Sequence, residues 1–116
     1  MKDVRKFTDN TGGGADHVSY VTGATDYLFL LAEFEYHGSR TYANSAEKNY
    51  QKQYDYYKAG NSKVHNRFEN PESAVGAWTR SAYAGYYDYF CLVNADGTPD
   101  YNDADNSWAL APGFAV

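Results

Sequence analysis

Apolar residues come in short runs along the chain, and the first clear run predicts a strand. Residues 27–31 are apolar over a length that suits a buried strand. At residues 33–37 we expect a short helix that ends at Gly38, because glycine commonly closes a helix in the left-handed conformation. Residues 1–25 are polar and contain a glycine triplet, which predicts a flexible N-terminal arm or linker, and the folded domain is expected to cover residues 26–116.

The middle of the chain carries a helical pattern. Residues 45–60 are predicted to form the longest helix, with Ser45 as its N-cap and Gly60 just after its end. Tyr50, Tyr54 and Tyr57 have the i, i+4, i+7 spacing of one helix face. We therefore expect this aromatic face to pack on the sheet.

From Trp78 onward the pattern becomes that of strands. Residues 89–93 are predicted to form a strand, residues 94–97 carry a strong turn signal, and residues 98–103 would form the returning strand of the hairpin. A further strand is expected at 108–111, interrupted by the Pro-Gly pair that follows it. The aromatic helix face is expected to pack on the sheet that contains Phe90 and Leu92.

Composition suggests a small core. The chain has 5 Leu, 7 Val, 6 Phe and no Ile, but 13 Tyr and 2 Trp. Aromatic side chains bury large areas, and a tyrosine can keep its hydroxyl in water. We therefore expect an aromatic-rich core with tyrosines left over for the surface, in a small α+β domain.

Charge excludes some partners. The formal net charge of -5 argues against a nucleic-acid backbone as partner and against a polybasic membrane-surface protein. No apolar run is long enough to span a bilayer, so no membrane insertion is expected. The N-terminal residues lack the apolar stretch of a signal peptide, so none is expected.

Neither a metal nor another cofactor is expected. The single cysteine, Cys91, excludes an internal disulfide and lies in an apolar stretch, where a buried inert thiol is favoured over a nucleophile. The three histidines lack the spacing of ligand pairs. Asp103 and Asp105 lack the order and closing Glu of a calcium loop, so an acidic loop is favoured there.

Catalytic motifs are missing too, since the sequence has no nucleophile elbow, phosphate loop or dinucleotide fingerprint. Glu33 and Glu35 could be paired carboxylates, but a strand-to-helix turn explains them equally well. Arg80 lies two residues after Trp78 and leaves two hypotheses: a buried structural pin, stacked on the Trp and bonded to backbone carbonyls, which we favour, or an exposed ligand residue in a pocket. The domain is thus expected not to be an enzyme.

One stretch has the composition of a binding surface. Residues 81–107 contain no Lys, Glu, Gln, Met or Trp, although the preceding 80 residues contain 15 of these types. Tyrosines here stand among Ala, Gly, Asp and Asn, as they do in paratopes. A tyrosine-rich hairpin with short loops would have the same composition. We expect the ligand to contact Thr79, Tyr83, Tyr86, Tyr87, Asp88, Tyr101, Asn102 and Asp103.

Five motifs carry a resemblance to a known family. They are Leu28 to Gly38 (LFLLAEFEYHG), Gln53 to Lys58 (QYDYYK), Trp78 to Ser81 (WTRS), Val93 to Gly97 (VNADG) and Asn106 to Phe114 (NSWALAPGF). In this order they resemble an uncharacterised bacterial and prophage domain family with a C-type-lectin-like fold. That resemblance implies short helices packed on a small twisted antiparallel sheet with irregular loops.

Two related groups share that fold. The Leu31-x-Glu33-x-Glu35-Tyr36 element is similar to the strand-to-helix turn of formylglycine-generating-enzyme-like domains, but their copper-binding cysteine pair is not present here. The variable proteins of diversity-generating retroelements also have this fold. Their adenine-directed mutation cannot create the five residue types that residues 81–107 lack.

The sequence therefore predicts a non-enzymatic domain that binds a protein or glycan receptor on a cell surface. A phage tail or a bacterial surface protein is the expected setting, as part of a longer chain or assembly. The alternatives are a structural module of a larger virion or cell-wall protein and a degenerate formylglycine-type enzyme scaffold.

Overall fold

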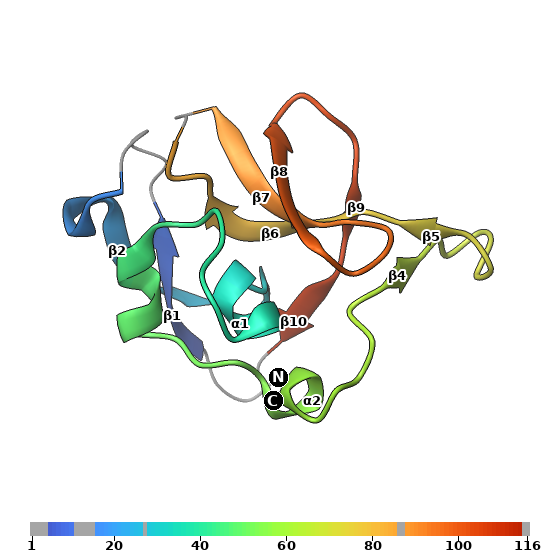
Figure 1. Cartoon of the computed structure of the whole chain (residues 1–116), viewed down its shortest axis with the longest axis horizontal. Helices are drawn as coiled ribbons and strands as arrows, with labels where there is room; N and C mark the ends of the chain where they lie inside the picture. Colours follow the sequence, from blue (N-terminus) through green and yellow to red (C-terminus); the bar gives the residue numbers. More distant parts are fainter. Residues whose placement is uncertain (1–4, 11–15, 27, 86–87, 115–116) are drawn as a thin grey trace.

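The computed structural model describes residues 5–10, 16–26, 28–85 and 88–114. These residues form short strands and short helical turns of the α and 3-10 (η) types, joined by irregular loops (Figure 1). In chain order the elements are β1 (Arg5–Asn10), η1 (Val18–Tyr20), β2 (Val21–Asp26), β3 (Leu28–Leu30), α1 (Glu33–His37), η2 (Ser45–Asn49), α2 (Asp55–Lys58), β4 (His65–Asn66), β5 (Ala74–Val75), β6 (Ala77–Ala82), β7 (Tyr89–Val93), β8 (Pro99–Asp103), β9 (Ala109–Leu110) and β10 (Pro112–Phe114).

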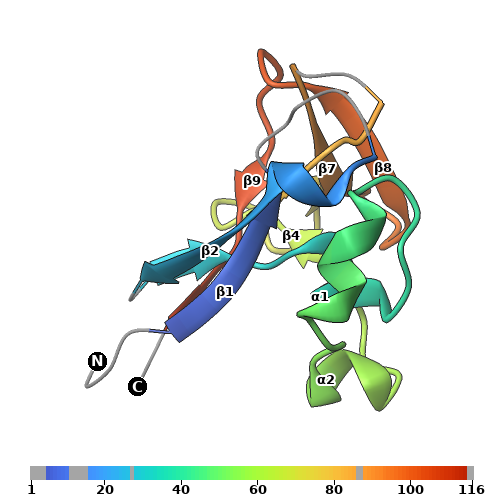
Figure 2. The ribbon, with the colours of Figure 1, turned by 90° about the vertical axis from the view of Figure 1, so that its left-hand side faces the viewer.

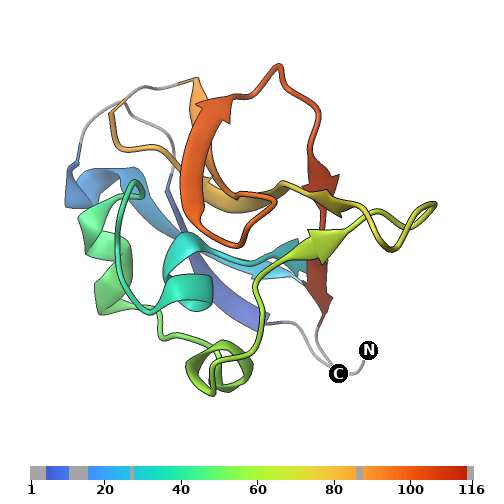
Figure 3. The ribbon, with the colours of Figure 1, turned by 45° about the vertical axis from the view of Figure 1, so that its right-hand side comes forward.

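The strands pair mostly antiparallel. A four-stranded sheet has the order β8-β7-β6-β9, in which only β9 runs parallel to its neighbour β6. Two-stranded pairs are formed by β1 with β2, β3 with β10, and β4 with β5. The β4-β5 hairpin projects from the body of the molecule (Figures 1 and 3). The chain is thus a small α+β domain, and none of the described helices is long and apolar enough to cross a membrane.

The C-terminal hairpin was predicted well. Strands β7 and β8 match the strands expected at 89–93 and 98–103, and the turn at 94–97 joins them. Gly97 in this turn has a φ of 87°, a conformation that favours glycine. The strand expected at 108–111 is shorter, and the Pro-Gly pair does not end the β-structure, because Pro112 opens β10 beside Leu30.

The strand and the helix between residues 28 and 38 also agree with the sequence-based predictions. Strand β3 confirms the strand predicted at 27–31, although residue 27 itself lies outside the described residues. Helix α1 covers residues 33–37, and a carboxylate oxygen of Glu35 accepts a hydrogen bond from the N–H of Ala32 at 2.9 Å. Gly38 has a φ of 68° and closes the helix, with its N–H donating to the carbonyl of Phe34 at 2.8 Å.

The single helix predicted at 45–60 is wrong. The structure has a 3-10 turn at 45–49, an extended segment, and then α2 at 55–58, with Gly60 at a φ of 92° just beyond it. The break has a tertiary cause. The N–H of Tyr54 donates to the carbonyl of Glu35 at 3.0 Å, and the Gln53 side chain donates to the carbonyl of Tyr36 at 3.0 Å. These bonds satisfy backbone carbonyls near the end of α1. Because residues 53 and 54 bind α1 in this way, residues 50–54 do not continue a helix.

Because the helix is broken, the three tyrosines of that segment do not share one face. Tyr54 and Tyr57 pack against Leu31, Tyr36 and Val93. Val93 lies in β7, the strand that contains Phe90 and Leu92, so the expected packing on this sheet is confirmed for these two tyrosines. Tyr50 is 62% exposed and does not share this packing. A helical spacing of three tyrosines therefore does not make one buried face here.

The core contains more small and charged residues than predicted. Phe29 and Tyr36 are aromatic residues buried in the described part of the chain. Around them lie alanines, aliphatic side chains and the carboxylates of Glu33, Glu35 and Glu47. Most of the remaining described tyrosines are only partly buried, so the aromatic-rich core is confirmed only in part.

The N-terminal segment, predicted as a flexible arm, contains regular structure where it is described. Strand β1 pairs antiparallel with β2 from Arg5 opposite Asp26 to Asn10 opposite Val21. This hairpin lies beside β6 and η2 along one side of the molecule (Figure 2). The domain boundary that we place after residue 25 stays a prediction.

Candidate functional site

Four tyrosines from three separate segments meet at one place in the fold. We call this group the tyrosine cluster, and it consists of Tyr42, Tyr83, Tyr89 and Tyr101. The rings of Tyr83 and Tyr101 are stacked, with centroids 4.0 Å apart and planes at 16°. Tyr42 meets Tyr101 edge-on at 4.7 Å, and Tyr89 lies 5.9 Å from Tyr101. All four rings are partly buried, so part of each one faces solvent.

Strand pairing decides which residues join the cluster. Tyr89 is paired with Asp103 and Cys91 with Tyr101, and the alternation along a strand places these pairs on the same face of the sheet. Phe90 is paired with Asn102, so both belong to the opposite face. The hairpin thus brings a carboxylate beside the rings.

Tyr83 is fixed by a close approach to the backbone. A β-carbon at Gly85 would lie 2.6 Å from the Tyr83 ring, closer than side chains tolerate. The Tyr83 N–H also donates to the carbonyl of Tyr89 at 3.0 Å. Glycine at position 85 therefore leaves room for the hydroxyl end of the Tyr83 ring close to the backbone.

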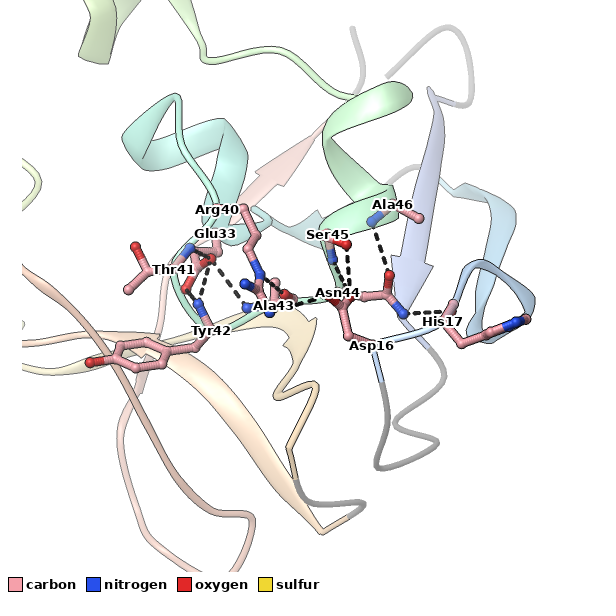
Figure 4. Close-up of polar contacts among 10 residues, drawn as sticks. All are labelled: Asp16, His17, Glu33, Arg40, Thr41, Tyr42, Ala43, Asn44, Ser45 and Ala46. Carbon is pink, nitrogen blue, oxygen red and sulfur yellow. Dashed lines mark hydrogen bonds and ion pairs between the residues drawn. The ribbon is translucent and has the colours of Figure 1, made fainter.

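Tyr42 is held by a buried carboxylate at the start of α1. Glu33 is 1% exposed, and its two oxygens accept four hydrogen bonds from consecutive backbone N–H groups (Figure 4). The donors are Thr41 at 2.7 Å, Tyr42 at 3.1 and 2.9 Å, and Ala43 at 3.2 Å. A charged acceptor makes such bonds strong, so Glu33 fixes the loop that carries Tyr42.

The same loop is tied to the N-terminal segment. The buried Asn44 side chain donates to the carbonyl of His17 at 2.7 Å, and Asp16 accepts hydrogen bonds from the N–H and hydroxyl of Ser45 at 2.7 and 2.9 Å (Figure 4). These bonds, the backbone N–H bond first, lower the pKa of Asp16. Two anchors, one on each side of Ala43, therefore hold the Tyr42 loop.

Arg80 has the geometry of the structural pin. Its side chain is 7% exposed and binds both carboxylate oxygens of Glu35, at 2.6 and 3.1 Å. The guanidinium also donates to the carbonyl of Leu30 at 2.9 Å. Sequence reasoning anticipated the backbone carbonyl but not the partner Glu35, which lies 45 positions away.

A third buried carboxylate, that of Glu47, lies near Cys91. Glu47 is 1% exposed, and one of its oxygens accepts hydrogen bonds from Ser81 at 3.1 Å and Gln51 at 2.9 Å. Its other oxygen has no partner in the described part of the chain. Burial raises the pKa of Glu47 to about 7 and also raises the pKa of the Cys91 thiol. A buried thiol with a raised pKa is the inert form that we favoured.

The opposite face of the sheet holds an apolar pocket of about 300 Å³. Its lining includes Trp78, Phe90 and Leu30, with Arg80 at one wall. Leu110 also lines it and is 67% exposed. The pocket and the tyrosine cluster thus belong to different faces of one sheet.

The predicted binding residues are distributed unevenly. Tyr83 and Tyr101 stack, Asp103 is paired with Tyr89, and Asp88 is exposed next to Tyr89. Thr79 does not belong to this surface, because it is 3% exposed and its hydroxyl donates to the carbonyl of Cys91 at 2.9 Å. Asn102 belongs to the opposite face by register. The predicted contacts Tyr86 and Tyr87 lie outside the described residues.

Sequence reasoning missed two members of the cluster. Tyr89 was assigned to the strand, but its pairing with Asp103 could have been derived from the predicted hairpin. Tyr42 carries no signal in the sequence, because its position depends on the loop bound by Glu33.

Comparison with known proteins gives the family of the chain. A family model described as a domain of unknown function (DUF6273) matches residues 3–116. The chain belongs to the DUF6273 family. No curated protein and no solved structure matches this DUF6273 domain. Within its described residues, no group of three or more His, Cys, Asp or Glu side chains could hold a metal ion.

Proposed function

We propose that this DUF6273 domain is a non-enzymatic binding module that contacts its ligand through the tyrosine cluster. The observation that carries the proposal is the meeting of Tyr42, Tyr83, Tyr89 and Tyr101 as partly exposed rings in one place. Clustered exposed aromatic surface usually marks an interaction site.

The chemistry of tyrosine suits this role. A tyrosine loses little conformational freedom on binding and offers both an aromatic face and a hydroxyl group. Here the rings are also held before a ligand arrives, because Glu33 fixes the Tyr42 loop and Gly85 admits the Tyr83 ring. Preorganised groups have less entropy to lose when a ligand binds. The cluster is therefore suited to contact a protein or glycan receptor.

The proposed fold and biological setting are supported by the resemblance of the sequence to a C-type-lectin-like domain family. We infer a C-type-lectin-like fold and a place in a phage tail or on a bacterial surface. Tyr83, Tyr89 and Tyr101 lie within residues 81–107, the stretch whose composition fits adenine-directed variation. A template copy of the gene that differs only at adenines would identify a diversity-generating variable protein.

A structural module is the second candidate, favoured by the apolar surface on the other face of the sheet. Leu28 is 56% exposed and Leu110 is 67% exposed, and both line a small hollow with Leu30. Packing inside a larger assembly would cover these side chains. In that case changing Leu110 to Ser would prevent assembly, and changing Tyr101 would not.

Selection of ligands from two unbiased collections tests the proposal. The domain is screened against a glycan array and a phage-displayed random peptide library, and every recovered ligand is tested on variants. We expect Tyr101→Ser to remove binding while its melting temperature confirms a folded domain. Tyr56→Ser is the matched control, because Tyr56 is 61% exposed on α2 and lies outside the cluster.

The test compares ligand binding by the Tyr101→Ser and Tyr56→Ser variants. Ligands that bind both tyrosine variants as well as the unmodified domain would overturn the proposal. The proposal also fails if neither screen yields a ligand that needs Tyr101.

A further inference from the structure

The tyrosine cluster has a charge pattern that points to the chemistry of its ligand. We propose that it binds a protein partner through arginine side chains of that partner. This inference rests on the proposed function and adds to it the class of ligand.

The charged side chains of residues 81–107 are all negative. Residues 81–107 contain five aspartates and neither Lys nor Arg, within a chain of net charge -5. The stretch supplies three of the four rings of the cluster. A surface of this sign attracts cationic partners and repels anionic ones.

Two of these aspartates lie next to Tyr89, one beside it in the chain and one paired with it across the sheet. Asp103 is paired with Tyr89 and shares its face of the sheet. Asp88 is exposed, and its carbonyl accepts a hydrogen bond from the N–H of Ala104 at 3.1 Å, which brings it close to the end of β8. Among the described residues, no ion pair involves Asp88 or Asp103.

Two arginines of the chain, Arg40 and Arg80, bind other residues. Arg40 lies 3.6 Å from Asp16 and donates to the carbonyl of Ala43. Arg80 is buried and bound to Glu35. Both guanidinium groups are thus engaged by other residues of the chain.

Ring geometry distinguishes arginine from compact cations. A quaternary ammonium group is bound in a cage whose rings stand apart around it. Here the rings touch one another, with Tyr83 and Tyr101 stacked at 4.0 Å and Tyr42 edge-on at 4.7 Å. A ligand must lie over the outer surface of the cluster. A flat guanidinium can stack there and still bind a carboxylate with its N–H groups.

Short synthetic peptides test this inference. The first alternates glycine with arginine, and the second replaces each arginine by citrulline, which keeps the shape and removes the charge. A third contains lysine. We expect fluorescence anisotropy to show tightest binding of the arginine peptide, with citrulline weaker by about tenfold or more.

Variants locate the binding. Asp103→Asn should weaken binding of the arginine peptide and reduce the salt dependence of its affinity, because a partly exposed negative charge is lost. Asp96→Asn is the matched control, since Asp96 is exposed in the turn at the far end of the hairpin. Tyr101→Ser should remove binding, and Tyr56→Ser should not. Melting temperatures verify that each variant folds.

Three results would overturn the inference. These are equal binding of the citrulline peptide, equal binding of the lysine peptide, and equal effects of the changes at Asp103 and Asp96, which would indicate general charge attraction. A neutral peptide or a saccharide that needs Tyr101 would overturn the arginine partner while leaving the proposed function intact. Selected ligands whose binding does not depend on Tyr101 would overturn both the arginine partner and the proposed function.

Discussion

The carboxylate of Glu33 binds the backbone N–H of Tyr42 with both of its oxygens, at 3.1 and 2.9 Å. A residue at the start of a buried helix thus fixes an aromatic ring at the surface. Without this acceptor the N–H groups of Thr41, Tyr42 and Ala43 would lose their partner. The internal structure of the domain is therefore coupled to its candidate binding surface.

Replacing Glu33 by alanine should destabilise the domain by about 3 kcal/mol or more, because several donors lose a charged acceptor. Urea unfolding measures this change, and near-ultraviolet circular dichroism should report altered packing of the tyrosines. Glu69→Ala is the control, because that side chain is 73% exposed. If Glu33→Ala unfolds at the same urea concentration as the unmodified domain, Glu33 does not hold the loop.

Replacing Arg80 by alanine should cost about 3–5 kcal/mol, because Glu35 would be left as a buried charge without its partner. The matched control is Arg67→Ala, since Arg67 is 51% exposed and its partner Glu69 is exposed too. Thermal melting compares the two. Unchanged melting of Arg80→Ala together with lost ligand binding would instead favour the ligand-residue hypothesis.

Stability should depend on pH through Glu47. Burial raises its pKa from 4.5 to about 7, so the folded state holds the proton more tightly than the unfolded state does. Protonated Glu47 therefore contributes its whole share of the free energy of unfolding below pH 4.5, and this contribution is lost as the pH rises from 4.5 to about 7. The total effect is on the order of 3 kcal/mol.

Glu47→Gln isolates this effect, because glutamine has a similar shape and does not titrate. Relative to the unmodified domain, the variant should gain stability as the pH rises from 4.5 to 7. Histidines act in the opposite direction, since burial lowers the pKa of His37 to about 4 and acid therefore destabilises the fold. A stability difference that stays constant across this range would show that Glu47 is not buried as described.

Tyr54 and Tyr50 should respond differently to the same change. Tyr54 packs against the core cluster of Leu31, Tyr36 and Val93, so Tyr54→Ala should cost about 2–4 kcal/mol. Tyr50 is 62% exposed, and Tyr50→Ala should change stability by less than about 0.5 kcal/mol. Equal effects in thermal melting would show that the helical spacing, and not the broken segment, describes this region.

Local patterns predicted the elements whose bonds are local. The hairpin at 89–103 and the helix closed by Gly38 follow from turn and capping residues. The helix expected at 45–60 failed because the N–H of Tyr54 binds the carbonyl of Glu35, a tertiary bond that periodicity does not reveal.

The candidate site was predicted in part for the same reason. Tyr101 and Asp103 follow from the hairpin, and strand alternation could have separated Asn102 from them. Alternation along β6 likewise places Thr79 with buried Ala77 and Ser81. Tyr42 could not be predicted, because its approach to Tyr101 depends on a loop held by a buried carboxylate.

The central claim is that ligands bind at the tyrosine cluster. Its most direct test is a titration of the domain, labelled with ¹³C in all of its aromatic rings, with a ligand recovered by selection. The ring signals of Tyr42, Tyr83, Tyr89 and Tyr101 should shift with one common affinity, while those of Tyr50 and Tyr56 stay in place. Shifts confined to rings outside the cluster, or to side chains of the apolar pocket at Phe90 and Trp78, would contradict the account.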